Sequence, residues 1–198
     1  MSELKKGMFV VTNSTYLRNA LLRVMVFAYS ASILWSLLSL VATEKLQFQE
    51  RGFGLCLGLI GVGAVGGAGV LSFFRRRFTS ETILMAAQLI FGALCLAIGI
   101  SSNRGVILPA LVVIGFCWMT SMTTLNATAQ VNLPRKFRAR GMSAFLMSFA
   151  MGMSLGSLSW GWLAYALDLS WAFVAAALAM ALSTLAMVRL KIGPLAAE

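Results

Sequence analysis

The feature that most constrains this sequence is a series of six long apolar runs separated by short polar loops. A helix needs about 20 residues to cross the hydrocarbon layer of a bilayer, and each run is close to that length. Because the runs are apolar throughout rather than alternating, they favour helices over the strands of a membrane barrel. The sequence therefore predicts an all-α integral membrane protein, with six transmembrane helices at 20–41, 53–74, 82–100, 106–130, 142–164 and 171–188.

The residues outside these runs are too few to form a second domain. Of the 198 residues, 60% are hydrophobic and 11% are charged, whereas soluble domains carry roughly 25% charged residues. We expect one transmembrane domain at 20–188, between an N-terminal arm at 1–19 and a C-terminal tail at 189–198. The arm has no apolar segment followed by a small-residue cleavage site, so it does not resemble a signal peptide.

Lysine and arginine are divided unevenly between the two sides of the predicted bundle. Of the 16 basic residues, all but Lys45, Arg51 and Arg104 lie in the terminal flanks or in the loops after the second and fourth spans. Cytoplasmic loops carry such an excess, so we expect a multi-pass protein of the bacterial inner membrane with both termini in the cytoplasm. The net charge of +10 then reflects topology. No nucleic-acid partner is expected, because the charges are scattered between spans.

The sequence lacks the side chains that most catalytic and metal sites require. It contains no histidine and six acidic residues, none of them inside a predicted span. Its three cysteines lie within spans and lack the paired spacing of a disulfide or metal site. We therefore expect no catalytic residue, no metal and no cofactor, and we do not expect an enzyme.

Glycines are concentrated in the second and fifth spans, several of them at GxxxG spacing. Small residues let membrane helices approach closely, and ordinary packing within one bundle explains part of the pattern. The glycine-rich helix is also the second of each group of three, which is typical of the inverted three-helix repeats of transporters. We expect helix-packing or gating roles for Gly54, Gly58, Gly63, Gly67, Gly152, Gly156 and Gly161.

Polar residues follow helical faces in the first and fourth spans. Polar side chains that face lipid are costly, so each face should meet another helix or a water-filled cavity. Serine and threonine can instead bond to carbonyls of their own helix, which is harder for the carboxamides of Asn126 and Gln130. The substrate-cavity candidates are Tyr29, Ser32, Ser36 and Ser39 in the first span and Thr120, Thr123, Thr124, Asn126 and Gln130 in the fourth.

Two segments carry a resemblance to a known family. They are LLSLVATEKLQFQERGFGLCLGLIGVGAVGGAGV, where the first two spans meet, and NATAQVNLPRKFRARGMSAFLMSFAMGMSLGSLSWGWLA, which runs from Asn126 to Ala164. From about Tyr16 to Ile192 the chain resembles the C-terminal six-helix half of a major facilitator superfamily transporter. It is most similar to the branch of the enterobactin exporter and related bacterial efflux pumps. The resemblance implies that spans one and four line a central cavity, while spans two and five form the gating interface with the other half.

The basic loop residues match the family's pattern only in part. Those that match are Arg75, Arg76 and Arg77 after the second span, and Arg138, Arg140 and Gly141 before the fifth. Phe73 stands where the superfamily's loop motif places an acidic residue. This departure should weaken the charge lock between helices that the motif normally supplies.

The resemblance covers nearly all of this chain but half of the usual transporter. It implies efflux of a small organic solute, drug or siderophore-like metabolite, as an antiporter that works by alternating access. The expected partners are the lipid bilayer, a small-molecule substrate, and a complementary six-helix half or a second copy. A truncated fragment, a half-size subunit and a homodimer all remain open. The alternative function is a non-transporting six-helix membrane scaffold.

Overall fold

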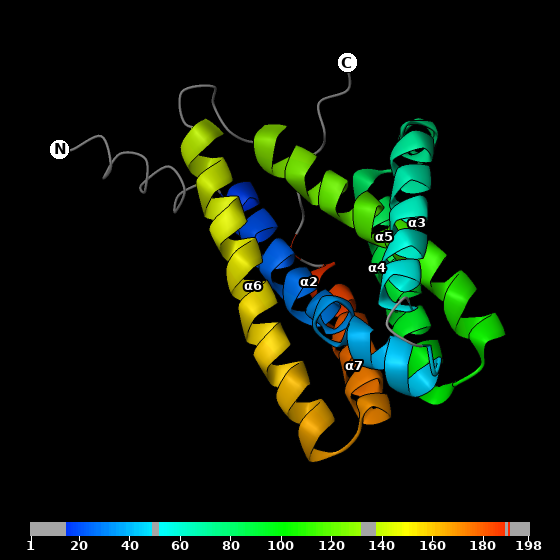
Figure 1. The fold of residues 1–198 in the computed structure, drawn as a ribbon. Coiled ribbons are helices and arrows are strands. Elements are labelled where there is room, and N and C mark those ends of the chain that lie inside the picture. The colour runs from blue at the N-terminus through cyan, green and yellow to red at the C-terminus, as the bar shows by residue number, and fades with distance from the viewer. Residues whose placement is uncertain (1–14, 49–51, 132–137, 189, 191–198) are drawn as a thin grey trace.

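The described part of the chain folds as a bundle of six long helices (Figure 1). The computed structural model describes residues 15–48, 52–131, 138–188 and 190. All regular structure in these residues is helical, and six helices are long and apolar enough to cross a membrane, which confirms the predicted fold class. They are α2 (Thr15–Leu40), extended by the π-helical turn η1 (Val41–Lys45), then α3 (Gly52–Arg75), α4 (Ser80–Ile100), α5 (Arg104–Val131), α6 (Arg138–Ala166) and α7 (Leu169–Met187).

The helices are longer than the apolar runs that predicted them. The 28 residues of α5 make a helix about 42 Å long at 1.5 Å per residue, enough to cross both the hydrocarbon layer and the headgroups. The start of α2 at Thr15 also makes the last residues of the expected arm helical. Residues 1–14 of that arm, and all of the expected tail except Leu190, lie outside the described residues.

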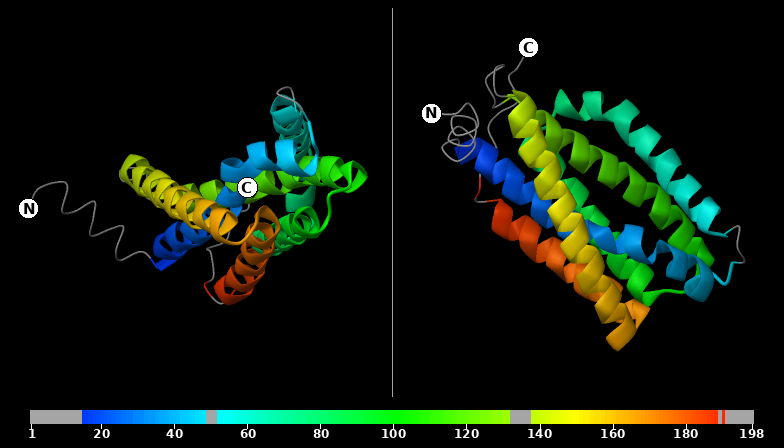
Figure 2. Two further views of the ribbon diagram at one scale, coloured as in Figure 1. Left: turned by 60° about the horizontal axis from the view of Figure 1, so that its bottom comes forward. Right: turned by 60° about the vertical axis from the view of Figure 1, so that its left-hand side comes forward.

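The helices pack in pairs that reflect an internal symmetry. α2 packs along α6, α3 along α5 and α4 along α7 (Figure 2). Consider an exchange of α2 with α5, α3 with α6 and α4 with α7. The pair α2–α6 then becomes the pair α5–α3, and the pair α4–α7 is unchanged. The lesser contacts α4–α5 and α7–α2 exchange in the same way. This is the arrangement expected of two three-helix repeats in opposite orientations.

Glycines set the close approach within two of these pairs. A Cβ atom on Gly63 would overlap the carbonyl oxygen of Val112, and one on Gly115 would overlap that of Ile60, so α3 and α5 are in backbone contact. On the other side of the bundle, Gly152 and Gly156 lie against backbone carbonyls of α2 in the same way. Such small residues permit the backbone approach that stabilises helix pairs in lipid.

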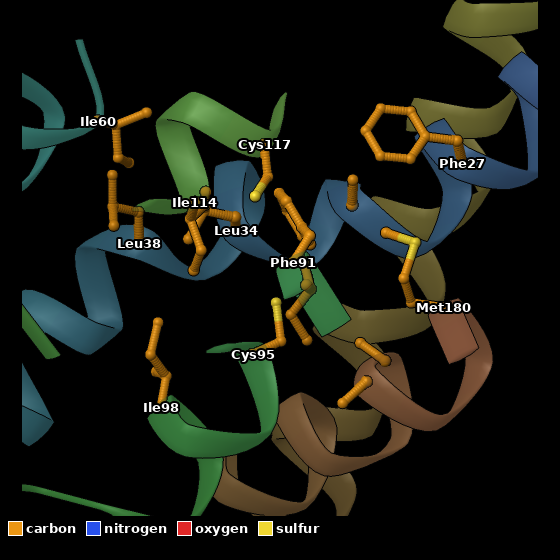
Figure 3. Packing of buried hydrophobic residues seen from close by; sticks show 14 of the residues in the cluster. Phe27, Leu34, Leu38, Ile60, Phe91, Cys95, Ile98, Ile114, Cys117 and Met180 are labelled. Carbon is orange, nitrogen blue, oxygen red and sulfur yellow. The ribbon is translucent and has the colours of Figure 1, made fainter. Parts of the chain in front are cut away.

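The apolar core lies where α2, α4, α5 and α7 meet. Figure 3 shows Phe27, Leu34, Phe91, Cys117 and Met180 converging there from those four helices. α2 is the most buried of the six spans, and α3 and α6 are the least. In Figure 1, α3 and α6 lie at opposite edges of the bundle, each with one side unpacked. These two flanking helices border the face that carries the candidate site.

Ion pairs and hydrogen bonds tie the helices together at both ends of the bundle. At one end, which we call the arginine end, Arg23 of α2 binds both carboxylate oxygens of Glu81 on α4, at 3.0 and 2.5 Å, and donates to the carbonyl of Met187 on α7. At the opposite end, Lys45 of η1 donates to the Gly99 carbonyl at 2.7 Å and to the Ser170 hydroxyl at 3.0 Å. Each tie thus joins the first span to α4 and α7.

Candidate substrate cavity

One polar face of α5 lines an open cavity of about 510 Å³. Thr123, Asn126 and Gln130, three of the residues expected to contact substrate, line its wall. They recur at steps of three and four residues, which places them on one side of the helix. The other lining residues are Met119, Met122, Ala127 and Val131 of α5 and Arg138 at the start of α6. The cavity therefore joins carboxamides, flexible apolar side chains and one cation.

The two carboxamides contact each other. The side-chain amide of Gln130 donates to the side-chain oxygen of Asn126, one turn earlier. A carboxamide has two N–H donors and one acceptor oxygen, so this single bond leaves donors on Asn126 and the carbonyl oxygen of Gln130. Those groups can serve a ligand in the cavity.

The opposite polar face of α5 is inside the bundle. Thr120, Ser121 and Thr124 are at most 3% exposed, and their hydroxyl oxygens have no hydrogen-bond partner among the described residues. Thr128 on the same face donates to the carbonyl of Thr124 at 2.9 Å. The structure thus places Thr120 and Thr124, both cavity candidates from the sequence, against other helices rather than in the open cavity.

Two of the candidate hydroxyl groups of α2, those of Ser32 and Ser36, bond within their own helix. Ser32 is buried and donates to the carbonyl of Tyr29, and Ser36 donates to that of Ser32, each at 2.8 Å. Ser39 is exposed at the far end of the helix. Such local bonds occur in many helices and need no ligand.

Tyr29 belongs to a second open concavity, between α2 and α6. Its ring lies 5.2 Å from that of Trp160, whose indole nitrogen donates to the Tyr29 carbonyl at 2.8 Å. The concavity also measures about 510 Å³ and includes Leu158, Ser159 and Trp162. Of the four predicted residues of α2, Tyr29 is thus placed in a concavity.

An aromatic cluster beside the cavity was missed by the sequence reasoning. Trp118 of α5 packs against Phe27 and Trp35 of α2, with ring centroids 5.5 and 5.3 Å apart, and against Phe149 of α6 at 6.1 Å. Trp118 precedes Met122 by one turn and so continues the row that leads to the carboxamides. The sequence does place these aromatic residues on the same helices as the polar faces, and that coincidence would have indicated the cluster.

The sequence matches the model of a protein family described as transmembrane secretion effector, over residues 1–198. The chain belongs to this family. The transmembrane secretion effectors are part of the major facilitator superfamily, so the chain is a multi-pass membrane transporter with an efflux-type function. Its surroundings are the lipid bilayer and its ligand is a small molecule. No curated protein matches the sequence.

In this secretion effector the basic loop residues have distinct surroundings. Arg77 lies over the ring of Phe73, 5.3 Å from its centroid, so the aromatic ring that replaces the motif's acid still attracts a cation. Arg75 is half-buried, with two side-chain nitrogens that lack a partner in the described part of the chain. Arg76 and Arg138 are exposed, Arg140 is exposed but engaged in an interaction, and Gly141 is buried.

The glycines of the secretion effector divide into two groups. Gly63, Gly67, Gly152 and Gly156 lie at helix contacts within this bundle, whereas Gly54, Gly58 and Gly161 have nothing within 4 Å of the point where a Cβ atom would lie. The sequence suggested a common interface with another half for spans two and five. The structure assigns Gly152 and Gly156 to packing on α2, and it leaves one glycine face of α3 open.

Proposed function

We propose that this six-helix unit corresponds to the C-terminal half of an exporter, of the branch that includes the enterobactin exporter. In this proposal it exports a small organic solute by alternating access against a second six-helix unit. The observation that carries the proposal is the open cavity on α5, where two carboxamides and Thr123 face away from the core. Polar groups at membrane depth are costly unless they meet protein or water. A face of this kind suits a solute path between two units.

The cavity chemistry supports a substrate that is rich in hydrogen-bond acceptors or negatively charged. Arg138 is the charged residue on its wall, and none of the lining residues is acidic. Arginine binds carboxylates and similar oxyanions well because its donors match their geometry. Methionine adapts to irregular apolar shapes, and the nearby Trp118 cluster offers ring faces. A siderophore-like metabolite fits this combination better than a cationic drug.

The flanking helices support pairing with a second unit. α3 and α6 are the least buried spans, and the open side of α3 carries Gly54 and Gly58. The partner in this proposal is a complementary six-helix half or a second copy of the chain. The arginine end would face the cytoplasm of a bacterial inner membrane, following the excess of basic residues there. Labelling of cysteines introduced at Arg76 and at Asn103 from the two sides of the membrane tests this orientation.

An efflux assay tests the transport function. Cells that express the chain with a candidate partner unit are loaded with a siderophore-like catechol compound, and its retention is measured. Asn126→Leu and Gln130→Leu should each reduce efflux several-fold, because each removes hydrogen bonds worth about 0.5–1.5 kcal/mol. Thr128→Val is the matched control, since it removes a polar group from the buried face of the same helix.

The assay separates the proposed cavity from the fold. If both leucine variants export as well as the wild type, the cavity assignment on α5 is wrong. If the wild-type chain with its partner unit exports nothing, the scaffold alternative gains support. Expression and melting temperature of each variant show that lost efflux does not come from lost protein.

A further inference from the structure

An apolar groove lies along α4 and α5, beside the end of α3. It has a volume of about 290 Å³ and is lined by five residues of α4, by four of α5 including Phe116 and Thr120, and by Phe74 at the end of α3. α3 and α4 follow each other in the chain but have few contacts, because each packs on α5 instead. The groove is therefore not covered by α3 along its length.

The groove is shaped for a linear apolar group. Its α4 wall runs from Thr82 to Ile90, about 12 Å along the helix at 1.5 Å per residue. It begins at Phe78, in the turn between α3 and α4, and continues toward the middle of the membrane span. A groove at this depth is bathed by acyl chains rather than by water.

Three arginines follow the groove's end in the chain. Phe74 and Phe78 both line the groove, and Arg75, Arg76 and Arg77 lie between them in the sequence, although they do not line the groove themselves. Arg76 and Arg77 are exposed and Arg75 is half-buried. Glu81, the nearest acidic residue in the sequence, is already engaged by Arg23. The accessible part of this arginine cluster can thus attract an external anion.

We propose that this groove binds one anionic phospholipid from the leaflet at the arginine end. One acyl chain lies in the groove between Phe74 and Ile90, and the phosphate lies at Arg75. Basic pockets between transmembrane helices are known to hold anionic headgroups, and the apolar groove directly below them supplies the place for the chain. A zwitterionic lipid lacks the net charge that three arginines attract. The proposal depends on membrane placement alone and not on the substrate or on the partner unit.

The test is native mass spectrometry of the full chain released from nanodiscs that contain phosphatidylglycerol and phosphatidylcholine in equal amounts. The wild-type chain should retain one phosphatidylglycerol. Arg75→Gln should weaken retention about fivefold, since one arginine near the surface contributes about 1 kcal/mol of lipid attraction. Ala86→Trp, at an exposed position on the groove wall, should abolish retention by filling the groove.

Matched controls come from the same helix and the same membrane side. Ala93→Trp adds an identical side chain at an exposed position seven residues further along α4, outside the groove. Arg18→Gln removes one exposed charge from the arginine end of α2. Both controls should retain the lipid as the wild type does. Ala86→Leu replaces Ala86→Trp if the tryptophan variant does not fold. Equal retention of phosphatidylcholine would overturn the proposal. Retention of phosphatidylglycerol by both Arg75→Gln and Ala86→Trp would also overturn it.

Discussion

At the scale of single residues, the contacts that matter most join positions far apart in the chain. Arg23 and Glu81 are separated by 58 residues in the sequence. No periodicity predicts such a pair, because it depends on which helices become neighbours. The side chain of Arg23 is 4% exposed and that of Glu81 is 33% exposed. The carboxylate therefore compensates a charge that is otherwise shut away from water.

Replacement of Glu81 by glutamine should destabilise the bundle. The variant keeps the shape of the side chain but leaves the guanidinium of Arg23 buried without its counter-charge. Hydrogen bonds to charged groups contribute about 1.5–3 kcal/mol, so we expect the free energy of unfolding to fall by roughly that amount. Thermal unfolding of the purified protein in detergent measures the change. The double variant Arg23→Met with Glu81→Leu should recover part of the loss, because it removes both charges together. If its loss of stability equals the sum of the losses of Arg23→Met alone and Glu81→Leu alone, this coupling is contradicted.

The candidate site was predictable from the sequence only in part, because it too depends on which helices become neighbours. The spacing of Thr123, Asn126 and Gln130 defined their common side of the helix, and the structure places an open cavity there. The spacing of Thr120 and Thr124 defined a second polar side equally well, yet that side is buried. Periodicity shows which residues share a face. It does not show whether a neighbouring helix covers that face.

At the scale of the helix, the sequence predicted the six spans because each is an uninterrupted apolar run of sufficient length. It did not predict which helices pair. α3 illustrates the ambiguity, since it has glycines on two sides. Gly63 and Gly67 face α5, where a Cβ on Gly67 would lie 2.9 Å from the Phe116 carbonyl oxygen. Gly54 and Gly58 lie on the open side. Both pairs have the same GxxxG spacing.

Alanine substitutions should separate these two glycine faces. Gly63→Ala and Gly156→Ala each place a methyl group against a backbone carbonyl, and overpacking of this kind costs about 1–3 kcal/mol. We expect lower melting temperatures and less folded protein for both. Gly58→Ala adds a methyl group where nothing lies within 4 Å, and it should leave the melting temperature unchanged or slightly raised. Equal destabilisation by all three variants would contradict this packing.

At the scale of the whole molecule, the way the helices pair leaves the outer sides of α3 and α6 open. The four helices α2, α4, α5 and α7 share the core, and α3 and α6 flank it with little cover. Exposed apolar residues such as Val62 and Val65, at 65 and 75%, accompany the open glycines of α3. Lipid can cover apolar side chains, but it gains nothing from a row of glycines. A closely packed helix does gain, because its backbone can approach.

Substitution of Gly58 by leucine should therefore impair function without impairing the fold of this unit. The added side chain meets no atom of the described bundle, so the melting temperature of the purified chain should match that of the wild type. If α3 packs against a second unit through this face, the leucine separates the two backbones, and efflux in the paired system should fall. Ala93→Leu is the control, at an exposed site on α4 away from the open face of α3. Export that is unaffected by Gly58→Leu, or equally reduced by Ala93→Leu, would show that the glycine face of α3 is not where a second unit packs.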